Sequence, residues 1–146
     1  MRVLIDTCVV VDVLQNREPF AADAQQIFLA AANKQIHACV SAKSMTDLYY
    51  LTHRFTHNDR ETRQVLTKLL YLFDVLDTTG IDCRQALVSE MSDYEDAVMV
   101  ATAIRSEMDC IVTRNTKDYA KAQTTVYSPS ELIQFLASED SAHDEL

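Results

Sequence analysis

The chain has 146 residues, of which 48% are apolar and 24% charged, and its 13 Lys+Arg against 22 Asp+Glu give a formal net charge of −9. At this length a single domain with a sizeable core is the default, and the composition is that of a folded globular protein rather than a disordered one. The acidity excludes the simplest kind of nucleic-acid binder, a protein with a uniformly basic surface.

The first half of the chain alternates short β-type runs with helical stretches. A strand is predicted at residues 3–5, which ends in Asp6, and a helix follows it. Pro19 can open the next helix, because proline fits the first helical position. A second strand at residues 36–40 leads into a helix over residues 42–55, whose apolar residues recur at helical spacing.

The second half continues the same alternation. In chain order it holds a helix capped by Thr56 or Asn58, a strand at 73–76, a helix capped by Thr79, a helix over 93–108, strands at 110–112 and 125–127, and a final helix opened by Ser128-Pro129. Strands that alternate with helices need crossover connections and form a parallel sheet buried on both faces. Ligands of such sheets bind at the carboxyl ends of the strands.

Acidic side chains are predicted at that edge. Asp6 directly follows the first strand, where it either projects toward a ligand or caps the following helix. Asp96 shares a helix face with Val100 and Ala103, and an unpartnered carboxylate on a buried face is costly. The alternative for Asp96 is a buried salt bridge with Arg114.

Further polar residues lie near the same strand ends. Asp93 extends the face of Asp96 by one turn or caps the helix, and Glu95 is expected to be solvated. Asp47 either leans over the sheet edge or is a surface acid, and Asp12 is expected to face water. The fourth strand is followed by Asn115 and Asp118, and the nearby hydroxyl groups of Thr7 and Thr113 can donate to carboxylates or phosphate.

Converging carboxylates with only Arg114 as a nearby cation would repel one another strongly. Mg²⁺ or Mn²⁺ relieves such repulsion, because these ions prefer oxygen ligands. A metal held there polarises a phosphoryl group and lowers the pKa of a bound water. The residues therefore predict a metal-dependent phosphoryl-transfer site.

Neither zinc nor a membrane is expected. The four cysteines form no CxxC pair and have no ligand spacing with the histidines, which indicates reduced, buried thiols. The apolar runs are too short to span a bilayer, and the carboxylate at position 6 falls where a secretory signal would still be apolar. We therefore expect a cytoplasmic protein.

An ordered series of segments resembles the PIN-domain family over about residues 1–137. The segments are Val-Leu-Ile-Asp6-Thr-Cys, Ser41 to Asp47-Leu48-Tyr49, Asp93-Tyr94-Glu95-Asp96-Ala97, Thr113-Arg114-Asn115-Thr116-Lys117-Asp118-Tyr119 and Ser128-Pro129-Ser130-Glu131-Leu132. The third and fourth segments are the most specific part of the resemblance.

The resemblance implies a three-layer α/β/α sandwich with a central, mostly parallel sheet of about five strands. It also implies a ribonuclease that uses Mg²⁺ or Mn²⁺, similar to the virulence-associated protein C type toxins of type II toxin–antitoxin pairs. Such toxins act on RNA, form homodimers and are covered by an antitoxin protein. We expect the nuclease domain to span residues 1–137 and residues 138–146, with four acids and no Lys or Arg, to form a disordered tail.

Position by position, Asp6, Asp47 and Asp96 match the first three acids of the family, which makes them the predicted catalytic and metal-binding residues. Asp47 is shorter than the Glu that relatives often carry. Asn115 stands where a fourth acid is common, so either Asn115 or Asp118 completes the set. Asp93 is a further candidate beside the metal.

Three alternatives stay open. A haloacid-dehalogenase-type phosphatase needs a second Asp two residues after Asp6, where this chain has Cys8. A receiver-type phosphoacceptor would use Asp77 but lacks the paired acids near Asp6. A catalytically impaired PIN-like protein that binds RNA or a partner without cutting is the third.

For a protein that acts on RNA, the candidate RNA contacts are Lys43, Arg54, Arg60 and Arg114.

Overall fold

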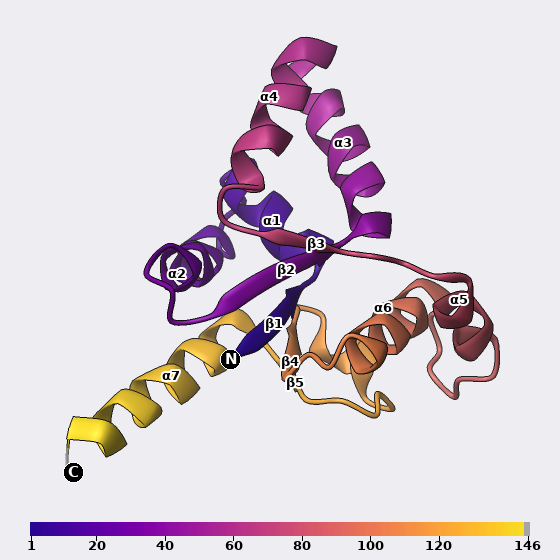
Figure 1. The fold of residues 1–146 in the computed structure, drawn as a ribbon. Helices are drawn as coiled ribbons and strands as arrows, with labels where there is room; N and C mark the ends of the chain where they lie inside the picture. Colours follow the sequence, from indigo (N-terminus) through magenta and orange to yellow (C-terminus); the bar gives the residue numbers. More distant parts are fainter. Residues whose placement is uncertain (145–146) are drawn as a thin grey trace.

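A parallel sheet forms the centre of the fold (Figure 1). The computed structural model describes residues 1–144, and within them five strands pair in the order β3-β2-β1-β4-β5. The strands are β1 Arg2–Ile5, β2 His37–Ser41, β3 Asp74–Leu76, β4 Cys110–Val112 and β5 Val126–Tyr127. Every pairing is parallel, which confirms the predicted fold class.

Helices connect the strands in the predicted alternation. They are α1 Thr7–Leu14, α2 Ala21–Ala32, α3 Ala42–Thr56, α4 Asp59–Leu69, α5 Gly80–Leu87, α6 Tyr94–Arg105, the short 3₁₀ helix η1 Thr116–Tyr119, and α7 Pro129–Asp144. Asn58 caps α4 and Thr79 caps α5 through their side chains, as predicted. Pro19 does not open α2, because that helix begins two residues later, after Phe20.

The two faces of the sheet bury separate apolar clusters, as the continuous apolar strands require. Val3 and Ile5 on one face pack with residues of α1, α2, α3, α4 and α7. Leu4 on the other face packs with Met99 and Val100 of α6. Figure 1 shows α2 and α7 on one side of the sheet, α5 and α6 on the other, and α3 and α4 as a hairpin that projects beyond it.

The last helix passes through the predicted end of the domain. α7 continues without a break from Pro129 to Asp144, so residues 138–144 are helical, and residues 145–146 of the expected tail lie outside the described part. The domain boundary at residue 137 stays a prediction. Among the described residues, no helix has both the length and the apolar character needed to cross a membrane.

The strand order fixes where the chain can build a site. From β1 the chain adds β2 and then β3 on one side, and it returns to place β4 on the other side of β1. The carboxyl ends of β1 and β4 therefore flank the point where the direction of winding reverses. In open parallel sheets, this is where ligands bind.

Candidate active site

Asp6 stands at the reversal point of the sheet. Its backbone N–H donates to the carbonyl of Val112, at the end of β4, over 2.9 Å. The Asp6 carboxylate caps α1, accepting from the Thr7 N–H (2.8 Å), and also accepts from the Thr113 hydroxyl (2.8 Å). Asp6 therefore caps α1, as one of the two interpretations predicted, and it also lines the cavity; its role toward a ligand stays a prediction.

The environment of Asp6 disfavours its charged form. Burial raises the pKa of its carboxyl above the ordinary value, although the hydrogen bonds from Thr113 and Thr7 oppose the rise. The neighbouring thiol of Cys8 lies 3.7 Å from Asp6 Oδ2. Burial, and then the Asp6 charge, raise the pKa of Cys8, so this thiol stays protonated and is not a thiolate nucleophile.

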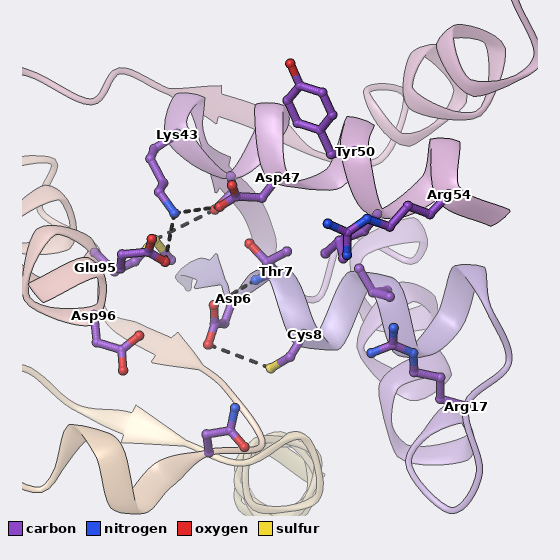
Figure 2. Close-up of a pocket in the computed structure, with 15 residues that line it drawn as sticks. Asp6, Thr7, Cys8, Arg17, Lys43, Asp47, Tyr50, Arg54, Glu95 and Asp96 are labelled. Carbon is purple, nitrogen blue, oxygen red and sulfur yellow. Dashed lines mark hydrogen bonds and ion pairs between the residues drawn. The ribbon is translucent and has the colours of Figure 1, made fainter. Parts of the chain in front are cut away.

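Asp96 faces the same cavity from the first turn of α6 (Figure 2). Burial, followed by the charges of Asp93 and Asp6, raises the pKa of Asp96 to about 6. The hydroxyl of Tyr119 donates to Asp96 Oδ1 over 3.1 Å and partly offsets this rise. The two carboxylates therefore repel each other across the cavity, as the sequence predicted for converging acids.

Asp47 lines the cavity but is held by a cation of its own helix. Lys43 Nζ lies 2.6 Å from Asp47 Oδ2 and 3.0 Å from Glu95 Oε2, so one ammonium group bridges α3 and α6 (Figure 2). Glu95 was expected to be solvated, and it does remain largely exposed, but it also lines the cavity. The i,i+4 spacing of Lys43 and Asp47 was visible in the sequence, whereas the contact with Glu95 depends on the packing of two helices.

The remaining predicted site residues take different places. Asp93 caps α6 by accepting from the Asp96 N–H (2.9 Å), and it does not line the cavity. Asn115 lines the cavity, with its backbone N–H donating to the Thr113 hydroxyl over 3.1 Å. Asp118 lies on η1, exposed and outside the cavity lining, although its charge contributes to the raised pKa of Asp96.

Arg114 is not the counter-ion of the acidic cluster. Its Nε lies 2.8 Å from Asp12 Oδ2, and its guanidinium stacks over the Phe20 ring at 4.3 Å from the centroid. Asp12 is only 1% exposed, so the expectation that it faces water was wrong. Three valines precede it and one follows, and this apolar context on α1 was the signal for burial. Asp77, the residue of the receiver alternative, does not line the cavity.

The cavity has a volume of about 560 Å³ and carries opposite charges at its two ends. Figure 2 shows the carboxylates of Asp6, Glu95 and Asp96 toward one end and the guanidinium groups of Arg17 and Arg54 at the other. Arg54 was predicted as an RNA contact and Arg17 was not. Arg17 lies in the turn after α1, and only the folded chain brings it to the cavity.

The donor set fits a hard divalent ion. Among the side chains that the structure describes, no three His, Cys, Asp or Glu lie close enough together to hold a metal ion. Asp47 is paired with Lys43, and Asp93 caps α6. Asp6 and Asp96 still face one cavity with raised pKa values, and Mg²⁺ is commonly bound through one or two carboxylates, waters and substrate phosphates. These two carboxylates would hold the ion, with Asn115 and Asp47 at its periphery.

Comparison with known proteins gives one family. Residues 2–117 match the sequence model of the PIN domain. No curated protein matches the chain significantly.

Several solved structures share the fold at low sequence identity. A toxin–antitoxin complex from Klebsiella pneumoniae has a TM-score of 0.63 and 23% identity, covering 87% of this chain and 97% of the other. VapBC2 from Rickettsia felis, bound to a DNA fragment from its promoter, has a TM-score of 0.66 and 14% identity, covering 88% and 98%. FitAcB from Neisseria gonorrhoeae has a TM-score of 0.65 and 19% identity, also covering 88% and 98%.

Proposed function

The chain belongs to the PIN domain family, and from the geometry of its acidic cavity we propose that it is a ribonuclease that depends on Mg²⁺ or Mn²⁺. The observation that carries the proposal is the pair of Asp6 and Asp96, from different elements, at the reversal point of a parallel sheet. Burial raises the pKa of each, and the charge of Asp6 adds to the effect on Asp96. Such an arrangement destabilises the metal-free protein and favours a divalent cation.

In phosphodiester hydrolysis, some residues of the chain would bind the metal ion and others would orient these metal-binding residues. A divalent ion bound here would stabilise the negative charge on the phosphoryl oxygens and lower the pKa of a bound water. Asp6 and Asp96 hold that ion, and Thr113 keeps Asp6 oriented through its 2.8 Å hydrogen bond. Tyr119 holds Asp96 in the same way over 3.1 Å. Because Cys8 stays protonated, we assign the nucleophile to water.

A cleavage assay tests this proposal. Purified protein, freed of any partner, is incubated with RNA in Mn²⁺ or Mg²⁺, and EDTA is expected to stop the reaction. Asp6→Asn and Asp96→Asn are expected to abolish it, while Asp23→Asn, which removes the same charge from an exposed position on α2, leaves it intact. Activity that survives both cavity substitutions would refute the assigned site.

A second function is favoured by two features of the cavity. Asp47 is paired with Lys43 over 2.6 Å, and Asn115 occupies a cavity position where an acid would bind metal more strongly. Both features fit a PIN-like protein that binds RNA or a partner without cutting. Wild-type protein that neither cleaves RNA nor gains thermal stability from Mn²⁺ would favour this alternative, because a ligand bound only by the folded state raises the Tm.

We further propose that the protein is the toxin of a type II toxin–antitoxin pair in the cytoplasm. A toxin–antitoxin complex is among the structural neighbours, and an acidic cavity suits a basic side chain from an inhibitory partner. Co-expression with a small protein encoded beside this gene is expected to give a co-purifying complex without ribonuclease activity. Full activity of such a complex, or a failure to form one, would contradict the assignment.

A homodimer is part of the same proposal. Its support is a shared surface of α5 and α6 on which Ile81 (56% exposed), Val88 (79%) and Ile104 (50%) line one groove. Large apolar side chains exposed together are typical of protein interfaces. Light scattering is expected to give twice the mass of the chain, and Ile104→Asp is expected to shift it to the monomer; a wild-type monomer would refute the dimer.

A further inference from the structure

One face of α3 carries residues of the cavity along its whole length. Asp47, Tyr50, Leu51 and Arg54 all line the cavity and follow one another at intervals of three, one and three residues. This spacing places them on a single helical stripe, about 10 Å long from Asp47 to Arg54 at 1.5 Å per residue. The stripe therefore leads from the carboxylate end of the cavity to the guanidinium end (Figure 2).

Arg17 is held at the guanidinium end by a neutral side chain. Gln15 donates its amide N–H to the carbonyl of Leu51 on α3 over 3.1 Å. The amide oxygen of Gln15 accepts from Nε and Nη2 of Arg17 over 3.2 and 3.0 Å. The guanidinium of Arg17 is thus held at the cavity by a neutral amide and forms no salt bridge with a carboxylate.

Arg54 also has no carboxylate partner among the described residues. Within residues 1–144, neither Arg54 nor Arg17 forms a salt bridge, whereas Lys43 and Arg114, two other cations near the site, are both paired. The Tyr50 ring lies between Asp47 and Arg54 on the stripe, is 65% exposed and stands at the rim of the cavity (Figure 2). Tyr50 makes a T-shaped contact with Tyr49 (ring centroids 5.5 Å apart) and still keeps most of its surface exposed. The cavity thus offers two guanidinium groups without a salt bridge and one exposed aromatic ring.

We propose that Arg17 and Arg54 bind a backbone phosphate of single-stranded RNA adjacent to the phosphodiester held at the carboxylate end, and that Tyr50 stacks on an unpaired base. This inference rests on the ribonuclease function proposed above and adds the residues that hold the strand beside the cleaved bond. A polynucleotide fits because it repeats the same negative group along a chain, so one phosphate reaches the metal end while a neighbour reaches the guanidinium end.

The expected recognition is tolerant of sequence. Contacts to phosphate position a strand but do not read its bases, and an aromatic ring stacks on any unpaired base. In a duplex, each base is paired and stacked on its neighbours, so its face is not available to stack on Tyr50. We therefore expect the strand's conformation, rather than a base motif, to decide binding at this subsite.

Binding is tested with a fluorescein-labelled 12-nucleotide oligouridylate, by anisotropy, in an Asp6→Asn background that leaves the probe uncut. Arg17→Gln and Arg54→Gln are each expected to weaken binding roughly fivefold, as is typical for one solvent-accessible ion pair. The double variant Arg17→Gln/Arg54→Gln is expected to reduce the slope of log affinity against log salt by about 0.7, the value for one phosphate of a single strand, and each single variant by part of it. Tyr50→Ala is expected to weaken binding roughly five- to tenfold, whereas Tyr50→Leu retains bulk but not stacking and is expected to behave like Tyr50→Ala.

The matched control is Arg84→Gln, which removes the same charge from an exposed position on α5 outside the cavity and is expected to leave affinity unchanged. Arg54 makes no hydrogen bond within the described residues, so Arg54→Gln remains informative even if Arg17→Gln disturbs the turn. Affinity and salt slope that stay at the parent level in both cavity variants would overturn the inference.

Three other outcomes are also decisive. If wild-type protein cleaves RNA with Mn²⁺ while Arg17→Gln/Arg54→Gln shows an unchanged KM, the subsite is wrong and the nuclease function stands. If wild-type protein neither binds Mn²⁺ nor cleaves RNA, the proposed function itself fails. An oligoglutamate peptide that binds through these arginines while the oligouridylate does not would assign the surface to a protein partner and overturn the RNA subsite.

Discussion

Replacing Lys43 with methionine tests whether its ammonium group competes with a divalent cation for the cavity carboxylates. Lys43 Nζ lies 2.6 Å from Asp47 and 3.0 Å from Glu95, and these two carboxylate side chains are 39% and 71% exposed. Each pair is open to solvent and contributes about 0.5 kcal/mol to the free energy of unfolding. The variant is therefore expected to fold and to melt only about 2–4 °C lower.

The larger effect is expected on metal binding. The ammonium is a fixed positive charge close to the proposed ion, and its repulsion of a divalent cation is on the order of 1 kcal/mol at a water-like dielectric constant. Its removal also frees Asp47 to turn toward the cavity. We therefore expect Lys43→Met to lower the Kd for Mn²⁺ roughly fivefold.

Isothermal titration calorimetry with Mn²⁺ measures this change directly. Lys68→Met is the matched control, because it removes the same charge from an exposed position on α4. The control is expected to bind Mn²⁺ as wild type does. Equal or weaker Mn²⁺ binding by Lys43→Met than by the control would refute the competition.

Three further predictions follow from the surroundings of single side chains. Asp96→Asn is expected to raise the free energy of unfolding of the metal-free protein by about 1 kcal/mol at pH 7.5, after allowance for solvent screening, because the raised pKa of about 6 makes the ionised carboxylate unfavourable. This gain is expected to shrink as the pH falls through 6 toward 4, since the wild-type carboxyl then takes up its proton, and an equal gain at pH 7.5 and 4.5 in urea titrations would contradict it. Thr113→Val removes the 2.8 Å hydrogen bond to Asp6 while keeping nearly the same side-chain volume. It is expected to weaken Mn²⁺ binding about tenfold in calorimetry, and an unchanged affinity would show that the hydrogen bond does not position Asp6. Asp82→Asn breaks a contact with Arg105 (2.8 Å) at a carboxylate that is 1% exposed and is expected to cost about 2–3 kcal/mol in urea unfolding without changing the Mn²⁺ affinity. Burial raises the pKa of Asp82, but the contact with Arg105 helps to lower it below its ordinary value. The stabilisation that Asp82 gives to the folded state is therefore present above pH 4 and lost as the pH falls through the lowered pKa. A variant as stable as wild type at pH 7 would contradict this.

Local patterns in the sequence predicted the framework of this fold. The three inner strands β2, β1 and β4 are short runs whose residues are buried apart from the first residue of β1 and β2, whereas the edge strands β3 and β5 are only partly covered. Most helix starts carry a residue that caps through its side chain. The predicted helix start at Pro19 was wrong, because proline at a first turn is only one of its favourable positions. The placement of Asp6 and Asp96 followed from strand ends and helix periodicity, both of which are local properties.

The partners of the charged side chains could not be predicted in the same way. Asp12 and Arg114 are 102 residues apart in the chain and meet only because β4 returns to lie beside β1. The bridge from Lys43 to Glu95 needs α3 and α6 to converge at one cavity. Such contacts depend on tertiary packing, which no periodicity in a single segment encodes.

The net charge of −9 takes on a different meaning in the folded chain. Part of the acidity lies at the cavity edge, where a bound divalent ion would reverse the local sign and attract phosphate. The guanidinium groups of Arg17 and Arg54 lie at the other end of the same cavity. An acidic protein of this kind is expected to bind RNA locally, modestly and with strong dependence on salt.

The central claim is that Asp6 and Asp96 hold a divalent ion at the reversal point of the sheet. Crystals soaked in Mn²⁺ and measured near the manganese absorption edge test it most directly. The account predicts an anomalous peak within coordination distance, about 2 Å, of both carboxylates. A strong peak elsewhere, or none between these two side chains at a Mn²⁺ concentration that supports RNA cleavage, would contradict it.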